Sequence, residues 1–172
     1  MPIYALNDVE PEIDPEAYVH PDAVVIGNVK IGPNSTIWPG AVLRGDSGRI
    51  EIGQDTSIQD GTVVHATHTL ATIIGSRCVV GHIAHLEGCT VADDVLVGSG
   101  SILLHRVQVQ PNSLVGAGAL LPPGTLVPSG AMALGVPAKI IPDKVAPGSL
   151  ASTVANYVNK GKLYRQSLRR LD

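Results

Sequence analysis

The chain has 172 residues and a net charge of −3, which suffices for one domain and excludes the strongly basic surface of a nucleic-acid-binding protein. Hydrophobic residues make up 44% and charged residues 16%, so the chain can bury a core and is not intrinsically disordered. It has no apolar run long enough to span a membrane, no basic signal region at its start and only two cysteines, so we expect a cytoplasmic protein without a disulfide framework.

The aromatic content is unusually low. Phenylalanine is absent and aromatic residues make up only 3%, whereas valine and isoleucine together number 35. A core without large rings must be filled by many similar branched side chains, and these favour pleated strands. The 19 glycines and 13 prolines are then the turns of a folded all-β protein.

The first 18 residues form an N-terminal segment, and from Val19 a repeat of six residues begins. A large aliphatic residue recurs at every sixth position with few interruptions, and a mostly small residue follows it by four. The aliphatic positions are Val19, Val25, Ile31, Ile37, Leu43, Ile52, Ile58, Val64, Ile74, Val80, Leu86, Val91, Val97, Leu103, Val109, Val115, Leu121 and Val127. Neither a helical period nor strict alternation explains this spacing.

This period predicts a left-handed parallel β-helix of hexapeptide repeats over residues 19–142. Three hexads make one triangular coil, the aliphatic residue points inward on each side, and the small residue fits near each corner. Phenylalanine would overfill so narrow a prism, which accounts for its absence. Residues 66–72 interrupt the period and are expected to project from a corner as a loop.

After residue 142 the pattern changes, and we predict a C-terminal α-helix over residues 149–171 that packs on the β-helix. Ser149 can cap its start, and apolar residues from Leu150 to Leu171 recur on one side. Gly161 weakens this helix, because glycine has a low helix propensity.

The repeat also sorts the polar residues onto sides of the prism. One side carries Leu43, Val64, Leu86 and Leu103, each followed by an outward residue: Arg44, His65, Glu87 and Leu104. A second side carries Ile37, Ile58, Val80 and Val97, with Pro39, Asp60, His82 and Ser99 outward two positions later. Because His65 and His82 lie on different sides, a second copy of the chain must bring them together, and a cyclic homotrimer satisfies this geometry.

Histidines cluster on the middle coils. His65, His68, His82 and His85 fall within 21 residues, and imidazole is the commonest metal ligand and suits zinc. A single histidine of this kind is more often an ordinary surface residue, but the cluster on aligned coils favours a metal site. His105 lies one coil above Glu87, where simple exposure explains it better than a supporting role.

Several motifs lie on these coils. They are Ser-Thr-Ile-Trp-Pro-Gly-Ala-Val-Leu-Arg-Gly-Asp at 35–46, Ile-Gln-Asp-Gly-Thr-Val-Val-His at 58–65, Val-Gly-His at 80–82, Leu-Glu-Gly-Cys-Thr at 86–90 and Val-Gly-Ala-Gly-Ala-Leu at 115–120. With them, residues 10–165 resemble the γ-class carbonic anhydrase family. Acyltransferases share the hexapeptide repeat, whereas the combination of Arg-Gly-Asp, Gln-Asp, His and Gly-His is more specific.

The resemblance implies a lyase that hydrates CO2 to bicarbonate with zinc, or another divalent metal such as Fe2+ or Co2+, at the interface of a trimer. Two of the three family histidines match His65 and His82. The third stands where this chain has Glu87, and a histidine occurs two residues earlier. We favour His85 as the third ligand, because a third imidazole keeps the charge of the site. Glu87, which keeps the stacking position, is the alternative.

The resemblance also implies roles for other residues. Arg44 and Asp46 match a pair that orders the subunit interface. Gln59 and Asp60 match residues that orient the metal's water or bicarbonate, and Tyr157 matches a tyrosine brought to the site by the terminal helix. His68 is a candidate proton carrier in a loop without carboxylates, so a low activity is expected.

Other functions fit parts of the same pattern. The chain could be an acyltransferase or a thioesterase acting on coenzyme A thioesters, the latter with a metal hydroxide or Cys89 as nucleophile. It could also be a non-catalytic, metal-binding trimeric scaffold, a reading that the altered third ligand keeps open.

Overall fold

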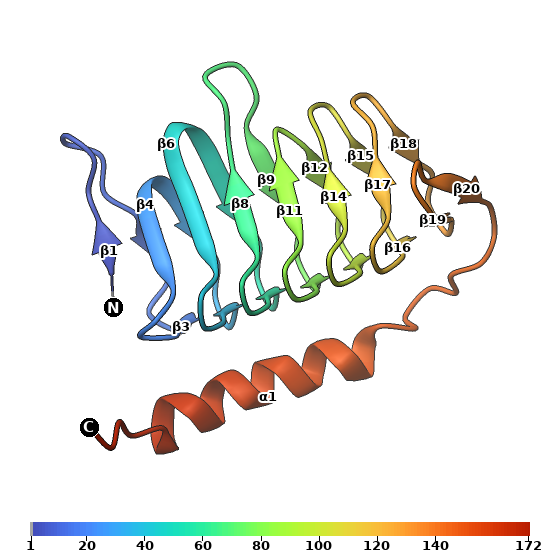
Figure 1. The fold of residues 1–172 in the computed structure, drawn as a ribbon. Coiled ribbons are helices and arrows are strands. Elements are labelled where there is room, and N and C mark those ends of the chain that lie inside the picture. The colour runs from blue at the N-terminus through green and yellow to red at the C-terminus, as the bar shows by residue number, and fades with distance from the viewer. Residues whose placement is uncertain (1) are drawn as a thin grey trace.

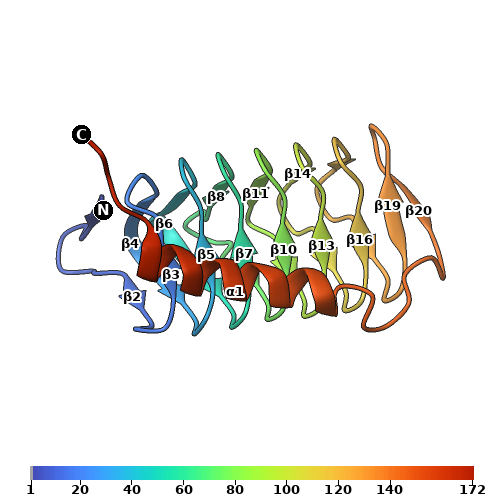
Figure 2. The ribbon, with the colours of Figure 1, turned by 90° about the horizontal axis from the view of Figure 1, so that it is seen from below.

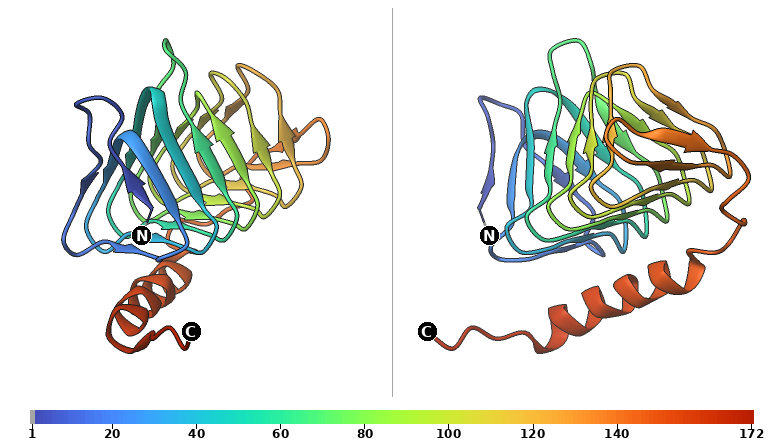
Figure 3. Two further views of the ribbon diagram at one scale, coloured as in Figure 1. Left: turned by 60° about the vertical axis from the view of Figure 1, so that its left-hand side comes forward. Right: turned by 45° about the vertical axis from the view of Figure 1, so that its right-hand side comes forward.

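The six-residue period of branched side chains folds into a three-sided left-handed β-helix, as Figure 1 shows for the computed structural model, which describes residues 2–172. The predicted fold class is confirmed. Equivalent strands of successive coils pair in parallel and in register, so each side of the prism is a flat parallel sheet. Figure 3 shows the coils stacked along one axis.

We name the three sides by what lies on them. The histidine face contains the first part of β4 (Val24–Ile31) and of β6 (Val42–Ile52), followed by β8 (Val63–His65), β11 (His85–Glu87), β14 (Ile102–Leu103) and β17 (Leu120–Leu121). β4 and β6 continue round a corner onto the polar face, where they join β9 (Thr72–Ile74), β12 (Thr90–Val91), β15 (Gln108–Val109) and β18 (Leu126–Val127).

The third side is the helix face, which carries the C-terminal helix. Its strands are β3 (Tyr18–Val19), β5 (Thr36–Ile37), β7 (Ser57–Ile58), β10 (Val79–Val80), β13 (Leu96–Val97), β16 (Leu114–Val115) and β19 (Met132–Leu134). β20 (Lys139–Ile141) pairs antiparallel with β19 and ends this sheet.

The core consists of inward aliphatic ladders. Leu43, Val64, Leu86, Leu103 and Leu121 follow one another on the histidine face, and all are fully buried. The interior of the prism contains no aromatic residue among residues 2–172, because the buried rings of Tyr18 and Trp38 lie outside it, under the helix. The lack of phenylalanine follows from this narrow cross-section.

The N-terminal segment is part of the sheet rather than a separate lead-in. β1 (Ile3–Tyr4) and β2 (Glu12–Ile13) both pair in parallel with β4, so they cover the open edge of the first coil. An edge of unpaired strand groups invites association with other chains, and these two short strands reduce that exposure.

The C-terminal helix α1 runs from Ala151 to Ser167, which is shorter than the range 149–171 that the sequence indicates. Ser149 lies in the turn before it, and the N-cap is Leu150, which makes no side-chain cap hydrogen bond. Beyond Ser167 the backbone is extended at Leu168, and Leu171 is 82% exposed, so no packing supports further helical turns there. Among residues 2–172, no helix is both long and apolar enough to cross a membrane.

Helix α1 lies along the helix face, across β3, β5 and β7, as Figure 2 shows. Trp38 is the centre of this contact: its ring lies 6.2 Å from that of Tyr157 and 5.0 Å from that of Tyr164. A Cβ at Gly161 would meet Thr36 Cγ2 at 2.6 Å. Gly161 therefore lowers helix propensity but allows the helix to approach the sheet closely.

Candidate functional site

The polar residues of the histidine face lie in the order that the repeat predicts. Arg44 pairs with His65 and His65 pairs with Glu87 across neighbouring strands. The ring of His65 lies between two carboxylates, with Nδ1 2.7 Å from Glu87 Oε1 and Nε2 3.0 Å from Asp46 Oδ1. The Arg44 guanidinium donates to the other oxygen of Asp46. Arg44, Asp46, His65 and Glu87 thus form one continuous network.

The network holds both carboxylates in their ionised form. Partial burial raises the pKa of Asp46, but hydrogen bonds from Arg44 and His65 outweigh it and keep that pKa below its ordinary value. The hydrogen bond from His65 lowers the pKa of Glu87, and partial burial opposes this. Because ionised carboxylates only accept, both contacts of His65 are hydrogen bonds only when both ring nitrogens carry protons. A metal ion at His65 would therefore replace one of them.

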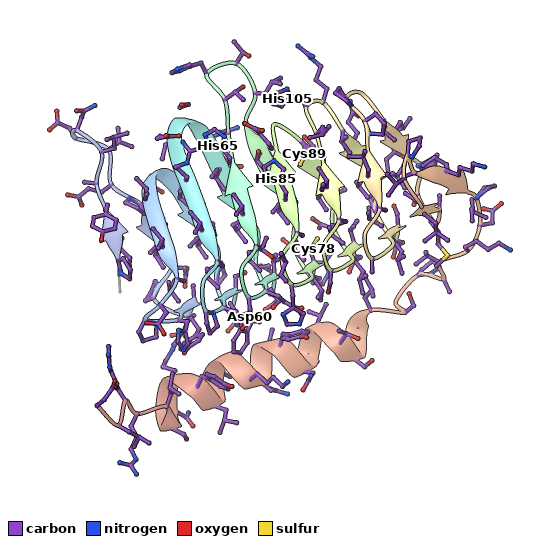
Figure 4. All side chains as sticks on the ribbon, in the orientation of Figure 1. Asp60, His65, Cys78, His85, Cys89 and His105 are labelled. Atoms are coloured by element: carbon purple, nitrogen blue, oxygen red, sulfur yellow. The ribbon has the colours of Figure 1, made fainter. Side chains whose placement is uncertain are left out.

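Glu87 has further imidazoles around its second oxygen. His85 Nε2 and His105 Nε2 each lie 3.6 Å from Glu87 Oε2, and Figure 4 labels both residues on the same side of the prism as His65. His105 Nε2 is buried and has no hydrogen-bond partner in the structure. The sequence favours simple exposure for His105, but the structure places its ring against Glu87. The signal for this was its place one coil above Glu87.

The helix face carries the second half of the candidate site. Asp60 and His82 occupy outward positions of neighbouring coils, and His82 Nδ1 lies 2.9 Å from Asp60 Oδ2. Both side chains are about half exposed, whereas Gln59 is buried at 4% exposure. Figure 4 shows Asp60 beside α1, away from His65. Asp60 therefore fixes His82 through Nδ1, which leaves its Nε2 for another ligand.

Tyr157 and His68 are the two remaining residues that the sequence singles out. The Tyr157 ring packs against Trp38, and Lys160 Nζ lies 5.5 Å from its centroid. His68 is exposed on the loop between β8 and β9, which Figures 1 and 3 show projecting beyond the other corners. Thr72 anchors this loop, because its hydroxyl donates to the His65 carbonyl and accepts from the Gly88 N–H.

One chain does not assemble a metal site. Among residues 2–172, no group of three histidine, cysteine, aspartate or glutamate side chains is arranged to hold a metal ion. His65, His85 and Glu87 lie on the histidine face, and His82 lies on the helix face. This is the separation that the six-residue count predicts.

Neither cysteine is available for nucleophilic chemistry. Cys78 and Cys89 are both free and buried in the prism. Burial raises the pKa of each thiol to about 12, so the reactive thiolate is not populated at neutral pH. Cys89 is therefore a packing residue, and its burial argues against a role as a thioesterase nucleophile.

Comparison with known proteins identifies relatives of this chain. Residues 10–129 match the family model described as the GMPPB C-terminal domain. The chain is 41% identical over 166 residues to mitochondrial gamma carbonic anhydrase 2 of Arabidopsis thaliana, covering 91% of this chain and 59% of that protein. It is 38% identical over 143 residues to the carnitine operon protein CaiE of Proteus sp. (strain LE138), covering 83% and 73% of the two chains.

A solved structure agrees over almost the whole length. The hexapeptide transferase family protein of Anaplasma phagocytophilum superposes with a TM-score of 0.89 at 36% identity, covering 95% of this chain and 98% of that one. In contrast, the chain spans only about 59% of the gamma carbonic anhydrase it matches. The comparisons therefore establish common ancestry and a common fold. The names of the related proteins differ and include a carbonic anhydrase, a carnitine operon protein and a hexapeptide transferase family protein.

Proposed function

The chain belongs to the hexapeptide-repeat, left-handed β-helix family that is represented by the GMPPB C-terminal domain model and by the γ-class carbonic anhydrases, and we propose that it hydrates CO2 reversibly to bicarbonate. One observation carries this proposal. The Arg44–Asp46–His65–Glu87 network lies on the histidine face, and the Asp60–His82 pair lies on the adjoining helix face. These residues occupy the motifs by which the sequence resembles that family.

The donor set fits zinc only when two copies share it. Imidazole and carboxylate are both zinc ligands, but within one chain no three of them from residues 2–172 are arranged to hold a metal ion. His65 of one copy and His82 of a neighbour would supply two ligands, and a cyclic homotrimer would repeat this site at each interface. Fe2+ and Co2+ suit the same ligands. The outward residues before the inward ladder on the histidine face support such a contact, because five of six are apolar: Val24, Val42, Val63, Ile102 and Leu120.

The third ligand comes from β11. Glu87 lies directly across from His65, whereas His85 lies two residues earlier on the same strand and pairs with Val63. This register supports Glu87 over His85, which the sequence analysis placed first. His85 and His105, both 3.6 Å from Glu87 Oε2, then support the carboxylate from its other side.

The protein residues prepare this site in distinct ways. Bound zinc would make water acidic enough to furnish hydroxide near neutral pH, which is the nucleophile that CO2 hydration needs. Asp60 holds His82 through Nδ1, and Arg44 fixes Asp46. Gln59, which is buried and precedes Asp60, would orient water or bicarbonate with its amide. The exposed His68, on the projecting loop between β8 and β9, would carry protons from the site to buffer.

Complementation between two inactive variants tests the shared site. His65→Ala and His82→Ala should each abolish CO2 hydration in stopped-flow assays of zinc-loaded protein. When the two variants are unfolded, mixed and refolded together, about a quarter of the interfaces should combine an intact His65 with an intact His82. We expect about that fraction of wild-type activity to return. Equal rates in the wild type and His82→Ala would contradict the proposal, and no recovery in the mixture would contradict the shared site.

Metal retention identifies the third ligand. Glu87→Ala should weaken zinc binding more than about a hundredfold, whereas His85→Ala should weaken it less, in the 10- to 100-fold range typical of residues that support a ligand. Competition with a chelator measures both affinities without any activity assay. The reverse order would assign the third ligand to His85.

The name of the Anaplasma phagocytophilum structure motivates a second candidate function, acyl transfer from coenzyme A thioesters. Release of free thiol from acetyl-coenzyme A in the presence of amine or sugar acceptors tests it. Two results together would favour the transferase. Thiol release would persist in the His65→Ala variant, and preparations that hydrate CO2 would release no thiol. Zinc binding without either activity would leave a metal-binding scaffold.

A further inference from the structure

One corner of the prism carries a column of turn residues with left-handed backbone. In each residue of this column φ is between 59° and 70°, and the N–H donates to a carbonyl of the preceding coil. The column consists of Gly40, Gly61, Ile83, Gly100 and Gly118. Four coils thus use the residue that adopts this conformation without a steric penalty, and the fifth uses isoleucine.

Ile83 is doubly unfavourable in an isolated chain. A β-branched residue at positive φ is strained, because its Cβ approaches the following carbonyl. Among the residues at 2–172 that have positive φ, Ile83 is the only β-branched one. Its side chain is also 74% exposed to water. Strained backbone and exposed large apolar surface on the same residue indicate a compensating contact elsewhere.

The neighbours of Ile83 leave it standing alone on this corner. A Cβ at Gly100 or Gly118 would meet no heavy atom within 4 Å, so the column above is open. Below it, a Cβ at Gly61 would lie 3.7 Å from Ile83 Cγ1. Ile83 is therefore the one large side chain in this column of turn residues, whose other members are glycines.

The corner separates the two halves of the candidate site. Ile83 directly follows His82 on the helix face and precedes β11, which carries His85 and Glu87 on the histidine face. In the shared site that we propose, His82 of one copy must reach His65 of another. Ile83 would then come against the outward residues beside His65, which include the apolar Val63 and Ile102.

We infer that Ile83 is an apolar anchor through which a second copy of this chain binds the histidine face, at the edge of the shared site. The inference rests on the proposed function for the placement of His82 beside His65. Burial of the side chain in this contact offsets the strain of the left-handed backbone. It also excludes water from one edge of the histidine and carboxylate groups.

Association of matched variants tests the anchor. Ile83→Gly removes both the strain and the apolar side chain, whereas Ile83→Leu keeps the apolar side chain. Sedimentation velocity over a dilution series of the full chain, treated with chelator, gives the concentration at which each assembly dissociates. We expect Ile83→Gly to raise this concentration about tenfold or more, because that is the effect of losing one buried aliphatic side chain. Ile83→Leu should stay within a few-fold of the wild type.

A second measurement keeps the test independent of folding. In a Val63→Asp background, in which we expect no assembly, Ile83→Gly should leave the urea midpoint unchanged or raise it, since the strain disappears and no contact is lost. Equal dissociation concentrations for Ile83→Gly, Ile83→Leu and the wild type would overturn the inference, as would a wild-type chain that stays monomeric. Because these assays contain no metal or CO2, failure of the proposed activity alone would leave their outcome intact.

Discussion

The histidine face and the polar face are built from the same coils, yet their outward residues differ in kind. The residues that precede the inward ladder on the histidine face are Val24, Val42, Val63, His85, Ile102 and Leu120. The equivalent residues on the polar face are Lys30, Glu51, Ile73, Thr90, Gln108 and Leu126. A face of a soluble solenoid that points to water usually resembles the second series.

This contrast separates what specifies the fold from what specifies the partner. The inward ladders are alike beneath both faces and are fully or almost fully buried. The helix face has α1 over it, and the polar face needs no cover. The outward residues before the ladder are mostly apolar on the histidine face. Figures 2 and 3 show α1 on another side of the prism, so no helix of residues 2–172 covers this face. An uncovered apolar face next to an incomplete set of metal ligands favours assembly of several copies.

The largest expected effect comes from placing a charge on each face. Val63→Asp puts a carboxylate on the histidine face, and Ile73→Asp puts one at the matching position of the polar face. Burial of an unpaired carboxylate in a contact costs several kcal/mol, so Val63→Asp should weaken assembly by about a thousandfold or more. Ile73→Asp should assemble as the wild type does. Sedimentation velocity and zinc content measured on the same samples report both consequences.

The contrast between the two faces would be wrong if the two variants did not differ in this way. Loss of assembly in Ile73→Asp, with Val63→Asp unaffected, would move the contact to the polar face. If neither variant lost assembly, the apolar outward residues of the histidine face would be exposed in the wild type as well. They would then no longer support a shared site.

Core substitutions compare the stability of the ladders that lie beneath the two faces. Leu86 lies under the histidine face and Ile74 under the polar face, and both are almost completely buried. Leu86→Ala and Ile74→Ala should each lower the free energy of unfolding by about 2–5 kcal/mol, because each leaves a cavity in a tightly packed ladder. Urea unfolding at a fixed protein concentration measures both. A loss confined to Leu86→Ala would mean that the ladders are not equivalent and that assembly dominates the stability.

The sequence was sufficient for the fold and for the sorting of residues onto faces. A period of six with few interruptions admits few structures, and its phase places Arg44, His65 and Glu87 on one side and Asp60 and His82 on another. The structure confirms these cross-strand positions. The reason is that side-chain direction follows from strand register, which a repeat specifies without knowledge of distant contacts.

Features that depend on rotamers or on packing between elements could not be predicted in this way. The repeat places His65 beside Glu87 but does not show that the His65 ring also contacts Asp46. The helix pattern extends to Leu171, whereas the helix ends at Ser167 and the backbone is extended at Leu168. The sequence marks Gly161 as a weakness of the helix, but a Cβ there would lie only 2.6 Å from Thr36 Cγ2, so the close packing of helix and sheet favours glycine. The six-residue count places Ile83 at a corner of the prism, but the count does not predict its positive φ.

The smallest expected effect is a pH dependence that belongs to the histidine face. The hydrogen bond from His65 lowers the pKa of Glu87 below its ordinary value of 4.5, so the folded chain binds this proton less readily than the unfolded chain does. The resulting stability is fully present above pH 4.5 and is lost as the pH falls through the lowered pKa. It amounts to about 1 kcal/mol or less, since the pair is partly exposed. Urea unfolding of chelator-treated protein between pH 6 and about pH 3 should therefore show a shallower acid-side decline for Glu87→Gln than for the wild type. Glu51→Gln, on the polar face, removes the same charge and serves as the control. An equal flattening in both variants would attribute the slope to overall charge rather than to the contact between Glu87 and His65.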